Sequence, residues 1–409
     1  MPDIFHSVFR VFLPFALGYF LSYLFRVVNA VIAPDLVADL GIDPSQLGLL
    51  TSTYFITFAL SQLPLGILLD RFGPRTVEAF LLIFAGLGAF IFAGSHSLSG
   101  VIIGRALIGF GVSACLMAAF KSYVIWFPER LWPRINGFQM AAGGLGALSA
   151  TTPVEWMMGF TDWRGLFYLL SVMSLAIAVI VFIVVPEKKP RTRSEESLAA
   201  QINGIKTVFK SLKFWQIAPL TTFSQGGFLS IQGLWAGPWL RDVAQLTRPQ
   251  VAFVLFWTAV AMITGFVFLG YVTEKLSARG VSVKASALSF MGIFVCVQAM
   301  VTFDLPVPPL LLWGLFGFFG TASILSYSAL SYAFPNALSG RVTTGINMLV
   351  FVTAFALQWA IGSIINLWDT SAAGHYHPSG YRAAFLLVIL LQTAGLAWSL
   401  AVSSKADNK

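Results

Sequence analysis

Long apolar segments alternate with short polar segments along the whole chain. Apolar runs of about eighteen residues or more are typical of helices that cross a membrane. At a rise of about 1.5 Å per residue, such a run crosses about 30 Å of hydrocarbon. The predicted segments are 9–33, 46–69, 77–95, 99–125, 134–158, 164–185, 212–239, 251–272, 282–302, 308–333, 341–366 and 380–402. The pattern therefore predicts an all-α membrane protein with twelve transmembrane helices.

The composition agrees with lipid as the main solvent of the fold. The chain is 57% hydrophobic and 10% charged, whereas soluble domains carry about 25% charged residues. No small-residue cleavage site follows the first apolar segment, so we expect that segment to stay as a helix. Cys115 and Cys296 both fall inside apolar segments, which predicts free thiols and no disulfide framework.

The distribution of Lys and Arg predicts the orientation. Most of them fall in the segments on the side of the two termini, and only Arg164, Arg241, Arg248 and Arg382 fall on the other side. The positive-inside rule therefore places both termini in the cytoplasm of a bacterial-type inner membrane. The net charge of +8 is explained by this topology, so we expect the lipid bilayer as partner and no nucleic acid.

The chain reads as two related halves, 1–186 and 212–409, joined by a polar cytoplasmic linker at 187–211. Three short motifs recur in the same order in both halves. "GILLDR" matches "GYVTEK", the Phe-Pro pair at 127–128 matches the pair at 334–335, and "WRGLF" matches "YRAAF". Three ordered matches predict a duplicated six-helix unit.

The motifs resemble those of the major facilitator superfamily over essentially the whole chain. "GILLDRFGPR" is similar to the family's loop motif between helices two and three, with Pro74 where a basic residue is common. "GRALIGFGVSA", from Gly104, is similar to the fourth-helix motif. The resemblance implies two pseudo-symmetric six-helix bundles around a central cavity and a secondary transporter that works by alternating access. We expect the chain to function as a monomer.

The resemblance also predicts a cytoplasmic latch between the halves. A carboxylate is favourable near the positive N-terminal end of a neighbouring helix. Asp70 would meet the start of helix eleven, and Glu274 would meet the start of helix five. The alternative is a plain positive-inside loop. The predicted latch residues are Gly66, Asp70, Arg71, Arg75, Arg134, Glu274, Lys275 and Arg341.

Three cations fall inside the predicted membrane helices, where charge is costly and usually functional. Arg26 and Arg105 lie about 12 and 9 Å below the outer face, and neither helix has an acid at that depth. Because Arg grips carboxylate or phosphate with two prongs, the pair predicts an anionic substrate. Lys121, nearer the cytoplasm, is a second candidate binding group for the anionic substrate. The alternatives are structural arginines bonded to backbone and a Lys121 that snorkels.

"YLFRVVN" adds Tyr23 and Asn29 around Arg26 and is similar to the first-helix pattern of the family's organic-anion branches. The second half supplies amides and aromatic rings in place of charge. A polar stripe along an apolar helix predicts a cavity wall, with helix–helix hydrogen bonding as the alternative. The predicted substrate-binding residues of the second half are Gln225, Gln232, Trp235, Tyr327, Asn347 and Gln358.

Glu155 is the only acid that the sequence places clearly inside a helix outside the loop motifs. It is therefore the candidate proton carrier, with an interfacial acid as the alternative. An enzyme would need His or acids clustered at one depth, and no Walker A loop for ATP is present. We expect no catalytic residues, metal or cofactor. The sequence predicts a secondary transporter of a small organic anion. The alternative is an exporter or uniporter of neutral or amphipathic molecules.

Overall fold

The computed structural model describes residues 8–128, 131–186, 206–371 and 374–407, which form helices and no strands. The all-α membrane fold expected from the sequence is therefore confirmed. The elements of the first half are η1 (Val8–Phe12), α2 (Leu13–Val27), α3 (Asn29–Leu40), α4 (Pro44–Phe72), α5 (Pro74–Gly94), α6 (Leu98–Gly111), α7 (Cys115–Trp126), α8 (Trp132–Ser149), α9 (Thr152–Met157) and α10 (Trp163–Val184).

The second half is helical in the same way. Its elements are α12 (Leu212–Ser230), η3 (Ile231–Trp235), α13 (Ala236–Asp242), α14 (Arg248–Ser277), α15 (Val283–Thr302), α16 (Pro309–Gly320), η4 (Thr321–Ile324), α17 (Leu325–Tyr332), α18 (Asn336–Ile365) and α19 (Pro378–Asp407). Each apolar segment predicted from the sequence coincides with one helix or with consecutive helices. The elements η1 and η3 are π-helices, and η4 is a 3-10 helix.

The predicted count of twelve crossings is only partly reproduced by helix length. In the described part of the chain, nine helices are long and apolar enough to cross a membrane, and a bent pair within α4 adds a tenth. The segments around α8 and α12 fall short for a physical reason. Arg134, Asn136 and Gln139 lower the hydropathy of α8, and Lys213, Gln216 and Gln225 lower that of α12. Twelve crossings remain a prediction.

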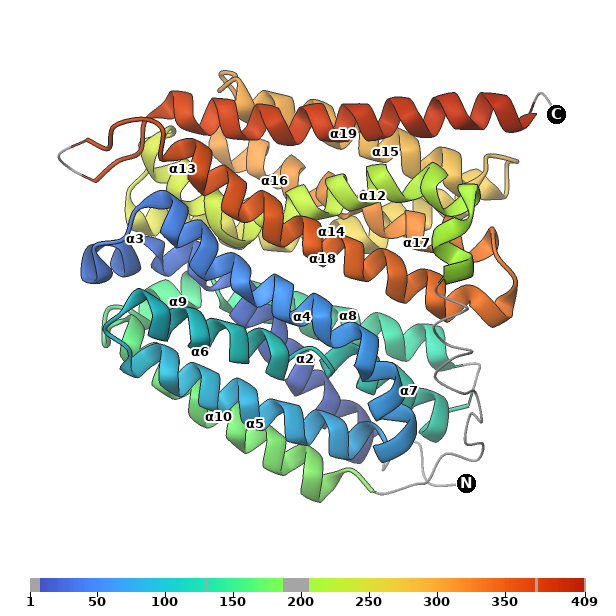
Figure 1. Cartoon of the computed structure of the whole chain (residues 1–409), viewed down its shortest axis with the longest axis horizontal. Coiled ribbons are helices and arrows are strands. Elements are labelled where there is room, and N and C mark those ends of the chain that lie inside the picture. The colour runs from blue at the N-terminus through green and yellow to red at the C-terminus, as the bar shows by residue number, and fades with distance from the viewer. Residues whose placement is uncertain (1–7, 129–130, 187–205, 372–373, 408–409) are drawn as a thin grey trace. The chain divides into compact units, whose positions relative to one another are not determined.

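The chain folds as two compact units, residues 1–42 with 49–195 and residues 43–48 with 196–409. In the first unit α5 packs against α6 and α10, and α2 packs against α7 and α8 (Figure 1). In the second unit α12 packs against α18 and α19, and α14 packs against α16. The predicted linker stays a prediction because 187–205 lies outside the described residues.

Small residues bring α5 and α6 into close contact. A Cβ added at Gly88 would meet the carbonyl oxygen of Gly104 at 2.7 Å, and one added at Gly104 would meet the nitrogen of Phe92 at 2.7 Å. Side chains larger than hydrogen would therefore push the two backbones apart. Such small-residue contacts are the usual way for membrane helices to pack, because lipid supplies little hydrophobic drive for helix association.

The loops that follow α4 and α14 each contain a glycine with positive φ. Gly73 has φ 79° and ψ 158° just before α5, and Gly280 has φ 89° just before α15. Only glycine adopts these conformations at little steric cost. Both glycines belong to the repeated sequences "GILLDRFGPR" and "GYVTEKLSARG". The two related loops thus turn with the same residue type.

Candidate functional site

Arg26 lies in the last turn of α2 and is 6% exposed. Its guanidinium carbon is 4.4 Å from the centre of the Tyr23 ring, 5.9 Å from that of Tyr54 and 5.5 Å from that of Phe58. These rings stabilise a positive charge through cation–π interactions. Arg26 therefore sits in an aromatic enclosure within the first unit.

Arg105 on α6 is 2% exposed and bonds to main-chain carbonyls. Its Nη1 donates to the carbonyl oxygen of Phe25 at 2.8 Å, and its Nε donates to that of Thr51 at 3.5 Å. The guanidinium carbon also lies 4.9 Å from the Tyr54 ring centre. Arg105 thus ties α6 to α2 and α4. This geometry favours the structural alternative that the sequence left open for Arg105.

Tyr54 on α4 is the residue that brings the two arginines together. It is fully buried, and its hydroxyl donates to the carbonyl oxygen of Ser22 at 3.1 Å. The site around Arg26 and Tyr54 is therefore formed between helices α2 and α4. The available signal for Tyr54 was weak: a tyrosine among several hydroxyl residues of a predicted membrane helix.

Tyr23 and Asn29 flank Arg26 at a spacing of three residues on either side. The backbone between Arg26 and Asn29 stays helical at Val28, with φ −52° and ψ −33°, so the three side chains share one helical face. The amide nitrogen and oxygen of Asn29 are buried and have no hydrogen-bond partner among the described residues. Buried polar groups normally find partners, so the amide of Asn29 has hydrogen-bonding capacity that the described residues do not use.

Lys121 on α7 forms an ion pair with Asp70 at the end of α4. The sequence placed Asp70 in the latch and Lys121 near the substrate, and it did not predict that they meet. The predicted contacts of Asp70 with helix eleven and of Glu274 with helix five remain predictions.

The other predicted latch residues have local contacts. Arg75 donates from Nη1 to the carbonyl oxygen of Val185 at 3.2 Å, and Glu274 is exposed. The guanidinium or ammonium groups of three basic residues lie 5.3–5.6 Å from the centre of a nearby ring on the same helix: Arg71 over Phe72, Arg134 over Phe138 and Lys275 over Tyr271. A Cβ added at Gly66 would meet no atom within 4 Å, and Arg341 is half-buried.

The predicted polar residues of the second half connect neighbouring helices. Nε1 of Trp235 donates to the carbonyl oxygen of Gln358 at 3.0 Å, and Nε2 of Gln358 donates to that of Ser230 at 3.3 Å. Nε2 of Gln232 instead points to Sδ of Met262 on α14 at 3.5 Å. Gln232 and Trp235 thus contact different helices because the π-helix η3 changes the angular spacing of successive side chains.

Two further predicted residues meet between α17 and α18. The hydroxyl of Tyr327 donates to Oδ1 of Asn347 at 3.3 Å, and both residues are half-buried. Gln225 on α12 is also half-buried, and its Oε1 has no hydrogen-bond partner in the part of the chain that the structure describes. The hydrogen bonds of Trp235 and Gln358 favour a role in helix–helix packing for these two residues. Gln225 keeps an acceptor oxygen that a ligand could use.

The expectation that Glu155 is the only acid clearly inside a helix outside the loop motifs is wrong. Glu78 on α5 is 0% exposed, whereas Glu155 is half-buried in the short helix α9. Glu78 lies three residues after Arg75, where the loop motif ends, and was not predicted from the sequence. A glutamate inside a predicted apolar segment was the available signal.

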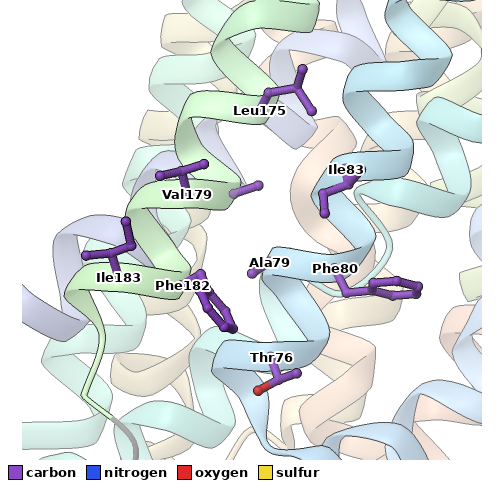
Figure 2. Close-up of a pocket in the computed structure, with 9 residues that line it drawn as sticks. Thr76, Ala79, Phe80, Ile83, Leu175, Val179, Phe182 and Ile183 are labelled. Atoms are coloured by element: carbon purple, nitrogen blue, oxygen red, sulfur yellow. The ribbon is translucent and has the colours of Figure 1, made fainter.

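Glu78 lies away from the exposed face of its helix. An apolar groove of about 540 Å³ between α5 and α10 is lined by side chains that include Thr76, Phe80, Ile83 and Phe182 (Figure 2). Phe80, Ile83 and Phe182 are exposed, as expected of a face that contacts lipid acyl chains. The lipid-facing side of α5 is thus occupied by these residues, and Glu78 is directed into the unit.

A second buried acid, Asp242 at the end of α13, was also missed by the sequence analysis. Its carboxylate accepts hydrogen bonds from Nε of Arg241 at 2.6 Å, from the hydroxyl of Tyr381 at 2.7 Å and from the backbone nitrogen of Tyr376 at 3.2 Å. Nδ1 of His375 lies 2.8 Å from it. Burial raises the pKa of Tyr376 to about 12. Asp242 therefore joins α13 to α19 and to the segment before it.

The fold and these buried groups define a multi-pass integral membrane protein that keeps guanidinium groups among its helices. The family model of the Major Facilitator Superfamily matches residues 15–357. The chain therefore belongs to the Major Facilitator Superfamily, as its loop and fourth-helix motifs implied.

Named relatives and solved structures agree with this assignment. The chain is 22% identical to a probable sulfoacetate transporter of Cupriavidus necator, over 68% of both chains. It is 24% identical to a probable L-galactonate transporter of Escherichia coli, over 70% of this chain and 66% of the relative. The fold is similar to a bacterial homolog of the human lysosomal transporter Spinster, with a TM-score of 0.79, 14% identity and coverage of 99% and 98%.

Proposed function

We propose that this protein is a secondary active transporter that moves a small organic anion across a bacterial-type inner membrane by alternating access. Both termini are cytoplasmic in this proposal. The observation that carries it is Arg26, a buried guanidinium on the same helical face as Tyr23 and as Asn29, whose amide has no partner among the described residues. Sulfoacetate and L-galactonate, the compounds named for two relatives, are small organic anions, which is the class of ligand that this proposal requires.

The two arginines have different roles in this proposal. Arg105 directs its nitrogens to the carbonyls of Phe25 and Thr51, so it positions the helices. Arg26 lies against aromatic rings, which hold a cation without neutralising its charge. A carboxylate or sulfonate that enters beside Arg26 would neutralise it through paired hydrogen bonds. Tyr23 and Asn29 would then bind the remaining oxygens of the anion.

The second candidate function is export or facilitated movement of a neutral or amphipathic molecule. It is favoured by the carbonyl bonds of Arg105 and by the amide contacts of Gln358, which show that intramembrane polar groups in this chain also serve packing. In that case Arg26 would only stabilise the packing of α2, for example through its aromatic neighbours. The two candidates differ in whether the charge of the ligand matters.

The test measures thermal stabilisation of the detergent-solubilised protein by paired ligands. Sulfoacetate and L-galactonate are compared with L-galactose as a neutral counterpart. A ligand at about one hundred times its Kd stabilises the folded state by about 2.7 kcal/mol. We expect stabilisation by at least one anion and none by L-galactose. Stabilisation by neutral or cationic compounds alone would favour the second candidate.

Variants of two arginines test whether the thermal stabilisation comes from anion binding at Arg26. Arg26→Ala should abolish the stabilisation by the anion. Arg382→Ala is the matched control, because Arg382 is exposed at the start of α19 and its loss removes the same charge. Equal loss in both variants would mean that the effect comes from net charge and would contradict the assignment to Arg26.

A further inference from the structure

We propose that Glu78 is the group that takes up and releases the proton coupled to anion transport, a role that rests on the proposed transport function. The carboxyl group is fully buried on α5. Neither of its oxygens has a hydrogen-bond partner of normal geometry among the described residues. In a folded protein such a group needs an explanation, since buried polar atoms are nearly always satisfied.

Three helices of the first unit enclose the carboxyl group. Gly18 on α2 has no side chain, and Oε1 of Glu78 occupies the place where a Cβ of residue 18 would lie. Sγ of Cys115 on α7 is 3.6 Å from the same point. The site therefore exists only because α2 carries glycine at this position. Its walls are α2, α5 and α7.

The neighbouring ionisable groups offer Glu78 no strong partner. From α7, the Cys115 thiol interacts with the carboxyl, but a thiol is only a weak donor. Tyr123, also on α7, interacts electrostatically with Glu78 as well, but its hydroxyl hydrogen is donated to Oε1 of Gln139 at 2.7 Å. An ionised carboxylate enclosed in this way is costly, so the closed packing favours the neutral acid.

Arg26 is the nearest cation on α2 and links the proton to the anion. It lies about two turns beyond Gly18, about 12 Å along the helix axis. At an effective dielectric constant of about 20, two unit charges at that separation change each other's binding equilibria by about tenfold. An anion that neutralises Arg26 removes its positive field from Glu78, so anion and proton bind more favourably together than apart. The coupling therefore has the sense of symport.

The proton step is a simple transfer to water. With the three helices packed, the carboxyl keeps its proton. When α2, α5 and α7 separate on one side of the membrane, water reaches the carboxyl, accepts its proton and solvates the carboxylate that remains. Protonation from the other side restores the closed packing. No covalent chemistry, metal or redox partner is needed.

The experiment compares Glu78→Gln with wild-type protein in proteoliposomes, using radiolabelled sulfoacetate and L-galactonate as probes. Two assays are run: accumulation driven by an inward proton gradient, and exchange of labelled for unlabelled anion at constant pH. We expect Glu78→Gln to lose accumulation by about tenfold or more, because glutamine cannot carry the proton. Exchange should stay within about twofold of wild type, since it needs no net proton movement.

Two further variants make the result specific. Asp304→Asn removes a carboxylate from the exposed segment between α15 and α16, and it should match wild type in both assays. Glu155→Gln tests the acid that the sequence favoured. The proposal is overturned if Glu78→Gln accumulates anion as wild type does, if it loses exchange as well while keeping its melting temperature, or if Glu155→Gln alone separates the two assays.

An infrared measurement separates failure of this proposal from failure of the proposed function. If wild-type protein moves neither probe, the transport proposal fails for these anions. The protonation of Glu78 is then measured directly by infrared difference spectroscopy between acidic and alkaline pH. A protonated carboxyl group gives a carbonyl-stretching band in these spectra. We expect a band that is absent from Glu78→Gln and present in Glu155→Gln. Absence of the band from wild type, or its persistence in Glu78→Gln, overturns the assignment.

Discussion

Replacing Arg105 by alanine should destabilise the protein, whereas replacing Arg26 should stop transport and leave the protein folded. The reasoning rests on the different partners of two buried guanidiniums. Arg105 donates to the carbonyl oxygens of Phe25 and Thr51. Arg26 lies against the rings of Tyr23, Tyr54 and Phe58.

The magnitude follows from the contacts of Arg105. A hydrogen bond that involves a charged group contributes about 1.5–3 kcal/mol, and the bond of 2.8 Å to Phe25 is of this kind. The bond of 3.5 Å to Thr51 is at the long limit and contributes less. Stacking on Tyr54 adds about 0.5–2 kcal/mol. We expect Arg105→Ala to lower the free energy of unfolding by about 2–5 kcal/mol.

The assay is equilibrium unfolding in mixed micelles, followed by tryptophan fluorescence and compared among wild type, Arg105→Ala and Arg26→Ala. Arg105→Lys should recover part of the lost stability, because an ammonium still donates but lacks the guanidinium fork. Anion exchange is measured on the same preparations. Arg26→Ala should remain folded, with a smaller loss of stability from its ring contacts than Arg105→Ala suffers, and show no exchange.

Two results would refute this reasoning. If Arg105→Ala unfolds at the same denaturant strength as wild type, its carbonyl bonds do not stabilise the packing of α2, α4 and α6. If Arg26→Ala is destabilised as much as Arg105→Ala, the aromatic enclosure is a structural device and Arg26 loses its proposed role in binding.

Three further predictions concern other charged groups. Arg26→Lys should reduce anion transport strongly but incompletely, because the charge remains and the planar fork is lost; transport equal to wild type would contradict this. Asp70→Lys or Lys121→Asp alone should slow transport, and the double exchange should restore much of it if their ion pair is functional; a double variant as slow as the singles would show otherwise. Asp242→Asn should lower the free energy of unfolding by about 3 kcal/mol, since it removes the charge that Arg241 pairs with, and a melting temperature equal to that of wild type would refute it.

Much of this protein follows from the sequence because the relevant signals are local. Helix positions follow from the length of each apolar segment, because a membrane helix must satisfy its own backbone hydrogen bonds. The family follows from short motifs such as "GILLDRFGPR", which work through a glycine turn and a charged helix end. The selection of Arg26 and Arg105 as candidates follows from their predicted depth, because charge inside a membrane is costly and usually functional.

Only the tertiary structure decided which partner each buried group meets. Depth in the membrane made Arg26 and Arg105 look alike, but α2 and α4 supply carbonyls to Arg105 and aromatic rings to Arg26. The burial of Glu78 depends on Gly18, a residue on another helix that leaves room for the Glu78 carboxyl group. The Asp242 carboxylate accepts a hydrogen bond from Tyr381, which is more than one hundred residues away in the sequence. From a sequence one can predict that a buried charge is energetically costly. The packing of helices that are distant in the sequence determines which groups bind that charge.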